Sequence, residues 1–489
     1  MSLAYLNSKD NSFFFNAQTQ FDSIITHLTS EQSSHNEHGH IEQFINKEGC
    51  EILRHLLQGY LDLRASKEKI RAFVTSSSGE KLNHIRHHNS RKLTTLFGNV
   101  KVSRKSYSQR KCPREFPLDG ELNLSKDQYS EGIKHRVIYE AINSSFDDSV
   151  NAIKRTTGAE IAKRQCLNLV KYSAQDFEFY YEQNAHKSRE ETQDILAITF
   201  DGKGIVMRPS SLRECTKKAA KKSKKLNSRL SAGEKKDRKR MAQVAAVYTT
   251  KANVRTADSI MKHDDNIRPL RTPPRNKRVW ASVEREAETV IEEAFKEALA
   301  RDPEQSREWV ILVDGLPHQL RLIDRVMKRL NVQATIIMDF IHVLEYLWKA
   351  AWCFFDKGDE AVEKWIEERA IKILKGQCSQ VARGLRISAG KRKVAKRDAI
   401  NKCADYLLKN QCRLRYGEAL AIGFPIASGV IEGACRHLIN DRLDITGARW
   451  GLEGAEAILK LRSLKSSGDI DAYLDFHRKM SKKRNYDLD

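Results

Sequence analysis

The 489-residue sequence lacks the cysteine patterns of a disulfide-stapled protein or a zinc ribbon. Its nine cysteines are an odd number, and no two of them form a Cys-x-x-Cys pair. Zinc ribbons use such pairs, and disulfide frameworks are typical of short secreted chains. The first twenty residues also have neither a basic segment nor an apolar stretch suited to a secretion signal. We therefore expect a protein of a reducing cytoplasm.

Long apolar runs are also missing, although apolar residues make up 40% of the chain. No run approaches the roughly 18 residues that a membrane span needs, which argues against a membrane-spanning protein. The chain is about three times the length of an average domain, so we expect several domains. Charge is the strongest bias, because 86 Lys and Arg face 64 Asp and Glu, a net +22. Such an excess favours a polyanionic partner, nucleic acid before an acidic membrane.

The N-terminal region is polar at first and then helical in pattern. Residues 41–65 space their apolar side chains three and four apart, which predicts an amphipathic helix that packs in a core or a dimer. Histidines recur on both sides of it, in HNEHGH and in HIRHHN, which contains His84, His87 and His88. Solvated loop histidines explain these two segments better than a metal site does.

A basic β-hairpin is predicted at residues 91–109, where apolar and polar residues alternate around Phe97-Gly98-Asn99. Lys101, Arg104 and Lys105 make it basic, so contact with the DNA backbone is one interpretation. Downstream, residues 145–170 have the pattern of two short helices joined by a Thr-Thr-Gly turn. This pattern is compatible with a helix-turn-helix, and an ordinary helical pair is the alternative. The second helix opens with the candidate DNA-reading residues Lys163, Arg164 and Gln165.

Strand-like runs alternate with helical ones from about residue 190. The segments 194–204 and 309–320 are apolar runs that end in Asp-Gly, and 334–340 resembles a further strand. Between them lie another strand candidate, 243–250, and an acid-rich helix, 282–300. This alternation predicts an α/β fold with a partly parallel sheet. The next stretch, up to residue 420, has an almost entirely helical pattern.

Asp201 and Asp314 each end a buried type of strand. Because the carboxyl ends of strands face the ligand crevice of an open α/β sheet, we expect these carboxylates to be neighbours. A lone strand-end aspartate more often caps a helix or pairs with a base, but two of them in a basic protein favour metal ligation. Phosphodiester displacement uses two Mg²⁺ ions held by about three carboxylates. The third candidate is Glu432, on a helix that Ser428 can cap.

Five ordered blocks of the chain carry a resemblance to a known family. They read TFDGKGIVM, LNSRLSAGEKKDRKRMAQVAAVYT, ILVDGLPHQL, IIMDFIHVLEYLWKAAW and SGVIEGACRHLINDRLDITGARWGLEGAEAILKLRSL. These blocks, with similar segments from residue 90 onward, resemble bacterial insertion-sequence transposases of the ISKra group, which are related to Mutator-like transposases. The resemblance implies a DDE transposase with a ribonuclease-H-like core. It also implies Asp201, Asp314 and Glu432 as the catalytic triad that binds two Mg²⁺ ions, with Mn²⁺ as a substitute.

Four further residues are candidates for auxiliary roles. Asp339 and His342 match the short Asp-x-x-His motif of Mutator-like transposases, and the alternative is an N-capping aspartate with a core histidine. Arg436 lies one turn after Glu432. Trp450 follows in the same block, where it either stacks on a base or packs in the core.

The run 217–240 contains twelve Lys or Arg against two acids. Next to a phosphate-cleaving site we interpret it as a clamp on the DNA backbone, which positions the protein without reading sequence. A solvated helix face or a tether is the alternative. The clamp candidates are Lys217, Lys218, Lys221, Lys222, Lys224, Lys225, Arg238, Lys239 and Arg240.

Taken together, these features predict a transposase that cleaves transposon ends and joins them to target double-stranded DNA, as a homodimer or larger assembly at the nucleoid. A nuclease or resolvase without strand transfer and a non-catalytic DNA-binding descendant are the alternatives, and a glycosidase would not explain the charge. The predicted segments are a helical and polar region (1–89), a basic DNA-binding region (90–185), the first part of the core (190–340), a helical insertion (341–420), the last part of the core (421–465) and a basic tail (466–489).

Overall fold

The structure, a computed structural model, describes residues 10–76, 78–184, 189–222, 238–261, 273–356, 358–390, 394–445 and 447–486. The chain divides into two compact units. Unit 1 consists of Met1–Asp176 and Asp471–Asp489, and unit 2 of Phe177–Ile470. No helix in the described ranges has the length and apolar character needed to cross a bilayer.

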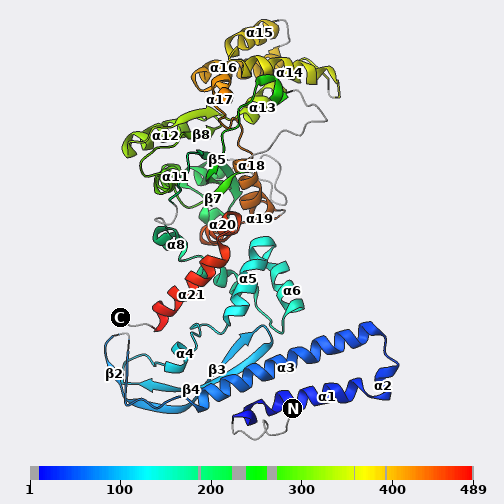
Figure 1. Ribbon diagram of the computed structural model, residues 1–489, viewed down its shortest axis with the longest axis vertical. Coiled ribbons are helices and arrows are strands. Elements are labelled where there is room, and N and C mark those ends of the chain that lie inside the picture. Colours follow the sequence, from blue (N-terminus) through cyan, green and yellow to red (C-terminus); the bar gives the residue numbers. More distant parts are fainter. Residues whose placement is uncertain are drawn as a thin grey trace. The chain divides into compact units, whose positions relative to one another are not determined.

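Unit 1 opens with a helical hairpin (Figure 1). Its longer helix contains the amphipathic helix predicted at residues 41–65, which is thereby confirmed. The ring of Phe44 packs against that of His27 at 4.1 Å, and the Gln20 amide donates to Glu48 at 2.7 Å. The elements are η2 (Asn11–Phe14), α1 (Phe15–Leu28), α2 (Glu31–Ser34) and α3 (His38–Ser66).

The predicted β-hairpin is present, and it packs on α3 through Leu61, Leu93, Val100 and Val102. Its basic side chains do not all face solvent, contrary to the prediction of a DNA-contacting hairpin. Arg104 is buried with its Nε 3.1 Å from Asp119, and the Lys105 ammonium donates to the Glu68 carbonyl oxygen at 2.7 Å. The strands are β3 (His84–Thr95) and β4 (Gly98–Ser108), and the short pair β1 (Val74–Thr75) and β2 (Lys81–Leu82) precedes them.

The two predicted short helices are also present, and the tip of the β-hairpin contacts the turn between them. The Gly158 amide donates to the Leu96 carbonyl oxygen at 2.8 Å. A Cβ atom on Gly158 would lie 2.7 Å from the Gly98 nitrogen, so the close approach of the two backbones requires glycine there. The helices of this region are α4 (Pro117–Glu121), α5 (Glu131–Asn143), α6 (Phe146–Thr156) and α7 (Lys163–Ser173).

The last helix, α21 (Ile470–Tyr486), covers most of the basic tail predicted at 466–489 and belongs almost entirely to unit 1. The Tyr473 hydroxyl donates to the Ser173 carbonyl oxygen at 2.6 Å. Burial would raise the pKa of Asp176, but hydrogen bonds with His477 and Arg484 hold this pKa below its usual value. These contacts join the two sequence segments that make up unit 1.

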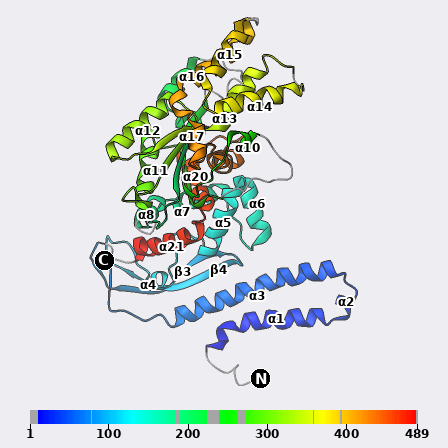
Figure 2. The same ribbon diagram turned by 45° about the horizontal axis from the view of Figure 1, so that its top comes forward.

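Unit 2 contains a five-stranded sheet in the order β7-β6-β5-β8-β9. Figure 2 shows strands of this sheet in green. The central strand β5 runs antiparallel to β6 and parallel to β8, and β9 is parallel to β8. The expected α/β fold with a partly parallel sheet is therefore confirmed. The strands are β5 (Ile195–Val206), β6 (Lys239–Thr250), β7 (Arg275–Ser282), β8 (Trp309–Val313) and β9 (Thr335–Met338).

Helices cover both faces of this sheet. Two successive residues of β5 show which helices lie on which face. Phe200 meets Phe295 of α11, with ring centroids 6.4 Å apart. Asp201 must point to the opposite face, because side chains alternate along a strand, and there it meets Cys435. The helices of unit 2 outside residues 340–421 are α8 (Phe177–Asn184), α9 (Glu214–Lys222), α10 (Ala257–Met261), α11 (Ala287–Arg301), α12 (Pro317–Leu330), α18 (Gly429–Ala434), α19 (Asp441–Leu443) and α20 (Leu452–Ser467).

The stretch predicted to be helical at 341–420 is helical in the structure, apart from its connecting turns. It leaves the sheet after β9 and returns just before α18. Its helices are α13 (Phe340–Ala351), α14 (Ala361–Leu374), α15 (Cys378–Gly390), α16 (Val394–Lys409) and α17 (Tyr416–Ala421).

A buried carboxylate ties α20 to the end of β7. Glu456 accepts hydrogen bonds from the Ser282 hydroxyl at 2.8 Å, from the Val283 amide at 2.9 Å and from the Glu284 amide at 3.1 Å. Burial raises the pKa of the Glu456 carboxyl group, because the charged form loses its contact with water. The three hydrogen-bond donors stabilise the carboxylate in place of water.

We predict that Glu456→Ala lowers the free energy of unfolding of unit 2 by about 2–4 kcal/mol, because buried donors lose their acceptor. All six tryptophans lie in unit 2, so denaturant unfolding followed by tryptophan fluorescence reports on this unit. The exposed glutamate of α14 supplies the control, Glu363→Ala, which should change the free energy by less than about 0.5 kcal/mol. Equal effects of the two substitutions would contradict the role assigned to Glu456.

Candidate active site

Three aspartates lie at one level of the sheet: Asp201 within β5, and Asp314 and Asp339 one residue after the ends of β8 and β9. Because β5 continues to Val206, the prediction that Asp201 ends a strand is wrong. Thr199 of β5 pairs with Leu312 of β8, and two residues further along both strands stand Asp201 and Asp314. Val313 pairs with Met338 of β9, and one residue further stand Asp314 and Asp339. Residues at the same level of neighbouring strands point to the same face. The predicted proximity of Asp201 and Asp314 therefore follows from the register, and Asp339 extends the row.

Asp314 is the electrostatically strained member of this aspartate row. Burial raises its pKa to about 7, and the negative charges of Asp201, Asp339 and Glu345 add to the effect. In the described part of the chain no hydrogen-bond donor reaches its carboxylate. The Tyr406 hydroxyl instead donates to the backbone carbonyl oxygen of Asp314 at 3.1 Å and so holds the main chain at the strand end.

Asp201 has two donors. The Gly202 amide donates to Oδ1 at 2.6 Å, and the Cys435 thiol donates to Oδ2 at 2.9 Å. Burial and the neighbouring Asp201 charge raise the pKa of Cys435, so the thiol keeps its proton. Cys435 was not among the site residues predicted from the sequence. Its signal was its position three residues after Glu432, which places both side chains on one side of a helix.

Glu432 is exposed on α18, one turn before the cysteine that contacts Asp201. The helix continues into a π-helical turn, η7 (Cys435–Asn440). Such turns are rare and occur frequently at functional sites. The structure thus brings the helix of the third predicted carboxylate to the face where the aspartate row lies.

Asp339 joins the row to this helix. One carboxylate oxygen accepts from the Ile341 amide at 2.8 Å and caps α13, as the N-cap alternative anticipated. The other oxygen accepts from the Ser428 amide at 3.0 Å and from its hydroxyl at 2.5 Å. Ser428 does precede α18, but its side chain makes no capping bond, so the prediction of a serine cap is wrong. Asp339 and Ser428 act together to position the helix that carries Glu432.

The other auxiliary candidates have different surroundings. His342 is half-buried against the rings of Tyr346 and Tyr406, with centroids 5.4 and 6.0 Å away. Arg436 is exposed, with its Nε 3.9 Å from Asp441. Trp450 is 6% exposed, and its indole donates to the Leu443 carbonyl oxygen at 3.0 Å. This is the core-packing alternative for Trp450, which leaves no free ring face for base stacking.

The predicted clamp residues fall into three groups. Lys218, Lys221 and Lys222 are exposed on α9, and Lys217 on the same helix pairs with Glu214 at 2.7 Å. Lys224 and Lys225 lie outside the described residues. Arg238 and Lys239 are half-buried at the start of β6, and the Lys239 ammonium is 3.8 Å from Asp444. Arg240 donates to the Val283 carbonyl oxygen at 2.7 Å, so this member of the predicted clamp serves the fold.

In unit 1 the candidate DNA-reading residues Lys163, Arg164 and Gln165 are exposed at the start of α7. Lys163 pairs with Asp147 of the preceding helix, while Arg164 and Gln165 project from the first turn. Exposure at the first turn of the second helix is what base contact by a helix-turn-helix requires.

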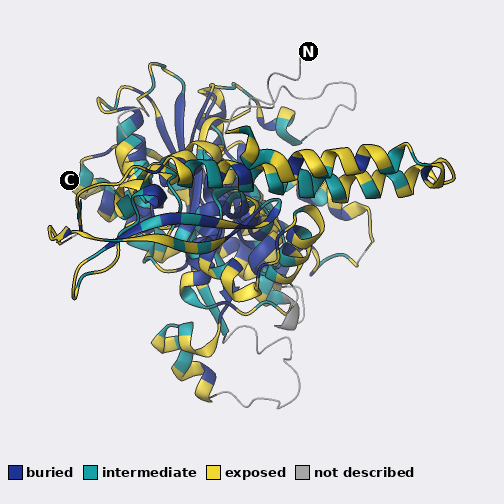
Figure 3. Ribbon diagram, turned by 90° about the horizontal axis from the view of Figure 1, so that it is seen from below, coloured by how far each residue is buried: buried dark blue, intermediate teal, exposed yellow. Residues whose placement is uncertain are grey.

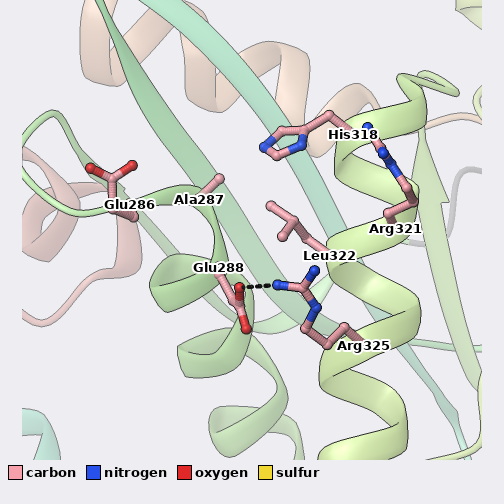
Figure 4. A pocket seen from close by; sticks show the side chains of 7 residues that line it. All are labelled: Glu286, Ala287, Glu288, His318, Arg321, Leu322 and Arg325. Carbon is pink, nitrogen blue, oxygen red and sulfur yellow. Dashed lines mark hydrogen bonds and ion pairs between the residues drawn. The ribbon is translucent and has the colours of Figure 1, made fainter. Parts of the chain in front are cut away.

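A pocket of about 410 Å³ lies between the start of α11 and α12 (Figure 4). Arg325 reaches across it to Glu288 at 2.9 Å, and His318 and Arg321 line the side formed by α12. None of the three aspartates lines this pocket. The side chains in it are of both charges, so it does not select an anion or a cation by charge alone.

The side chains near the aspartate row include oxygen donors that could bind a cation. The described residues contain no cluster of three or more His, Cys, Asp or Glu side chains arranged to hold a metal ion. Asp201 and Asp314 nevertheless form an adjacent pair of hard oxygen donors, which is the ligand type that Mg²⁺ prefers. Burial and, after it, the neighbouring carboxylates raise the pKa of Asp314, so a bound cation would favour its charged form.

The comparisons with known proteins cover part of this site. Residues 54–205 match the model of a family described as "Uncharacterised protein family (UPF0236)". The matched segment contains the β-hairpin, helices α5 to α7 and Asp201, and it ends before Asp314 and Glu432. No curated protein matches the chain.

We predict that Asp314→Asn stabilises the metal-free protein, and more so at about pH 8 than at about pH 5. The pKa of Asp314 is raised in the folded state, so the folded protein loses stability as pH rises from the unfolded-state pKa of about 3.9 toward 7. The substitution removes this loss. Denaturant midpoints from tryptophan fluorescence in chelator, at both pH values, provide the measurement.

Asp324→Asn on α12 is the matched control, since Asp324 lies outside the row. Its effect should be the same at both pH values. A stabilisation by Asp314→Asn that did not grow with pH would show that Asp314 is not electrostatically strained.

Proposed function

We propose that the protein is a DNA transposase whose catalytic core, unit 2, is ribonuclease-H-like. The observation that carries the proposal is the row of aspartates on three adjacent strands beside the helix of Glu432. The mixed sheet and the helical segment between β9 and α18 agree with the core and insertion implied by the resemblance to ISKra-group transposases. The match to an uncharacterised family does not conflict with this assignment.

Double-stranded DNA is the proposed substrate because of charge. The chain has a net charge of +22, and exposed cations stand on α9 and at the start of α7. Backbone contacts from α9 would position the duplex, and Arg164 and Gln165 would read bases in the transposon ends.

Each carboxylate has its own role in the proposed site. Asp201, Asp314 and Glu432 would hold Mg²⁺, which stabilises charge on the attacking and leaving oxygens when bound. Asp201 and Asp314 are already adjacent, and Glu432 stands on an exposed helix face where it can turn toward them. Asp339 is committed to Ile341 and Ser428, so its role is to position α18 and not to bind an ion.

We predict that Asp201→Asn, Asp314→Asn and Glu432→Gln each abolish Mg²⁺-dependent cleavage and strand transfer, while end binding stays nearly intact. Each change removes a charged ligand at constant volume. The assay uses purified protein with DNA that flanks its own gene, with and without Mg²⁺, and separates cleaved from joined products. The control substitutions are Asp398→Asn and Glu363→Gln, exposed carboxylates of the helical segment that should retain full activity.

Strand transfer by any one of the three variants would remove that residue from the site. Cleavage without joining by the unaltered protein would identify a nuclease or resolvase in place of a transposase.

A second prediction concerns α9. Replacing Lys217, Lys218, Lys221 and Lys222 with Gln should weaken binding to all duplex sequences about equally and flatten the salt dependence. Each lost phosphate contact reduces the slope of log K against log salt by roughly 0.9. The control makes the same charge change at four exposed lysines on other helices, Lys296, Lys364, Lys372 and Lys402. If both quadruple variants lose the same slope, α9 has no special role and only net charge matters.

A further inference from the structure

The helical hairpin of unit 1 exposes large apolar side chains that no part of the fold explains. Phe21 and Ile25 of α1 are 49% and 45% exposed. On α3, Ile45, Leu53, Leu56 and Tyr60 are 46%, 44%, 41% and 43% exposed. Figure 3 shows the hairpin with most of its surface exposed or half-buried. We refer to these six side chains as the hairpin face.

The six side chains lie on one side of the hairpin. A helix turns about 100° per residue, so the four on α3 fall within an arc of about 80°. The residues of α3 that contact the N-terminal helices, Glu48 against α1 and Gly59 against η2, point about 80–100° away from the centre of that arc. Phe21 and Ile25 are displaced by a similar angle from the side of α1 that faces α3. Because the helices run in opposite directions, both displacements lead to the same side of the pair.

Two glycines of α3 differ in a way that points to a partner. Glycine destabilises the interior of a helix relative to alanine, so it needs a compensating reason. For Gly59 the compensating reason lies within the same chain, since a Cβ atom there would lie 2.4 Å from the Phe13 carbonyl oxygen. Gly49 lies in the middle of the hairpin face, and a Cβ atom there would meet nothing within 4 Å. A second helix that approaches closely at Gly49 would supply the missing reason.

The charge of the hairpin argues against nucleic acid as this partner. Residues 10–66 contain eight Asp or Glu and three Lys or Arg, a net charge of −5. The rest of the chain has 83 Lys or Arg (86 − 3) and 56 Asp or Glu (64 − 8), a net charge of +27. An acidic element in so basic a protein repels polyanions and anionic membrane surfaces, while its apolar face suits a protein helix.

We propose that the hairpin face is a homodimer interface, in which the hairpins of two copies form an antiparallel four-helix bundle. The apolar positions of α3, with Gly49, are residues 45, 49, 53, 56 and 60, nearly symmetric about Leu53. A two-fold axis there sets Ile45 against Tyr60 of a second copy and Gly49 against Leu56, so one stripe complements itself. With a rise of about 1.5 Å per residue and a helix width of about 10 Å, α1 and α3 offer roughly 650 Å² in projection. This approaches the roughly 800 Å² per partner of a stable interface.

Oligomeric state tests this proposal independently of any catalytic activity. The full chain, freed of nucleic acid by nuclease and high salt, is examined by size-exclusion chromatography with light scattering over a wide concentration range. The unaltered protein should be a dimer, and Leu53→Asp combined with Leu56→Asp should raise the dimer dissociation constant at least roughly 100-fold. Ile70→Asp is the matched control, because Ile70 is 64% exposed in unit 1 but lies outside the hairpin face. This control should remain dimeric.

Gly49 keeps the test decisive if the double variant loses helical structure by circular dichroism. A side chain at Gly49 meets nothing within its own chain, so Gly49→Gln should leave the monomer folded and still disrupt the dimer. The axis itself is tested by Leu53→Cys, which should form an interchain disulfide under mild oxidation more readily than Ile70→Cys does. A chain that is monomeric at all concentrations, or a dimer that survives both the double variant and Gly49→Gln, would overturn the proposal.

Discussion

Like charges gathered at one level of three adjacent strands are the constraint on which unit 2 depends. The charges of the three aspartates are stabilised to different degrees. Asp339 accepts three hydrogen bonds and Asp201 accepts two, whereas the pKa of Asp314 is raised. Most proteins would avoid this arrangement, because a buried carboxylate without a donor or cation costs stability. A strained carboxylate beside two satisfied ones is what a fold would maintain if a cation completes the site.

The geometry around this row also explains how a helix distant in sequence is held at the sheet. Ser428 directs its hydroxyl to Asp339 and not to its own helix, and Cys435 directs its thiol to Asp201. One of these hydrogen bonds is therefore made by a residue shortly before Glu432 in the sequence, and the other by a residue shortly after it. The short helix that carries Glu432 is therefore held at both ends, while the exposed side chain of Glu432 stays free to move. This combination suits a ligand that must adjust as its partner binds.

Several parts of this arrangement could be predicted from sequence because they are local. The apolar run before Asp314 indicates the end of β8, and the apolar spacing of α3 indicates its amphipathic character. The same Asp-Gly pattern at Asp201 does not mark a strand end, because β5 continues its pairing with β6 to Val206. Partners could not be predicted in this way. Arg104 and Arg240 look like DNA-binding cations in a basic segment, but Arg104 pairs with a buried aspartate and Arg240 bonds a backbone carbonyl. A charged residue has the same letter whether it faces water or a buried carboxylate, and only long-range packing decides which. The missed Cys435 has the same explanation, since its significance depends on a strand 234 residues away.

Because α21 belongs to unit 1, the folding of unit 1 depends on the order in which the chain is synthesised. The partners of Asp176 and Ser173 arrive only with Tyr473, His477 and Arg484, after all of unit 2 has been translated. Until then the Asp176 carboxylate has neither of the hydrogen-bond partners that lower its pKa. A chain truncated within unit 2 would have an incomplete unit 1. The fold therefore couples stable assembly of its N-terminal unit, with the exposed start of α7, to completion of the carboxylate-bearing core.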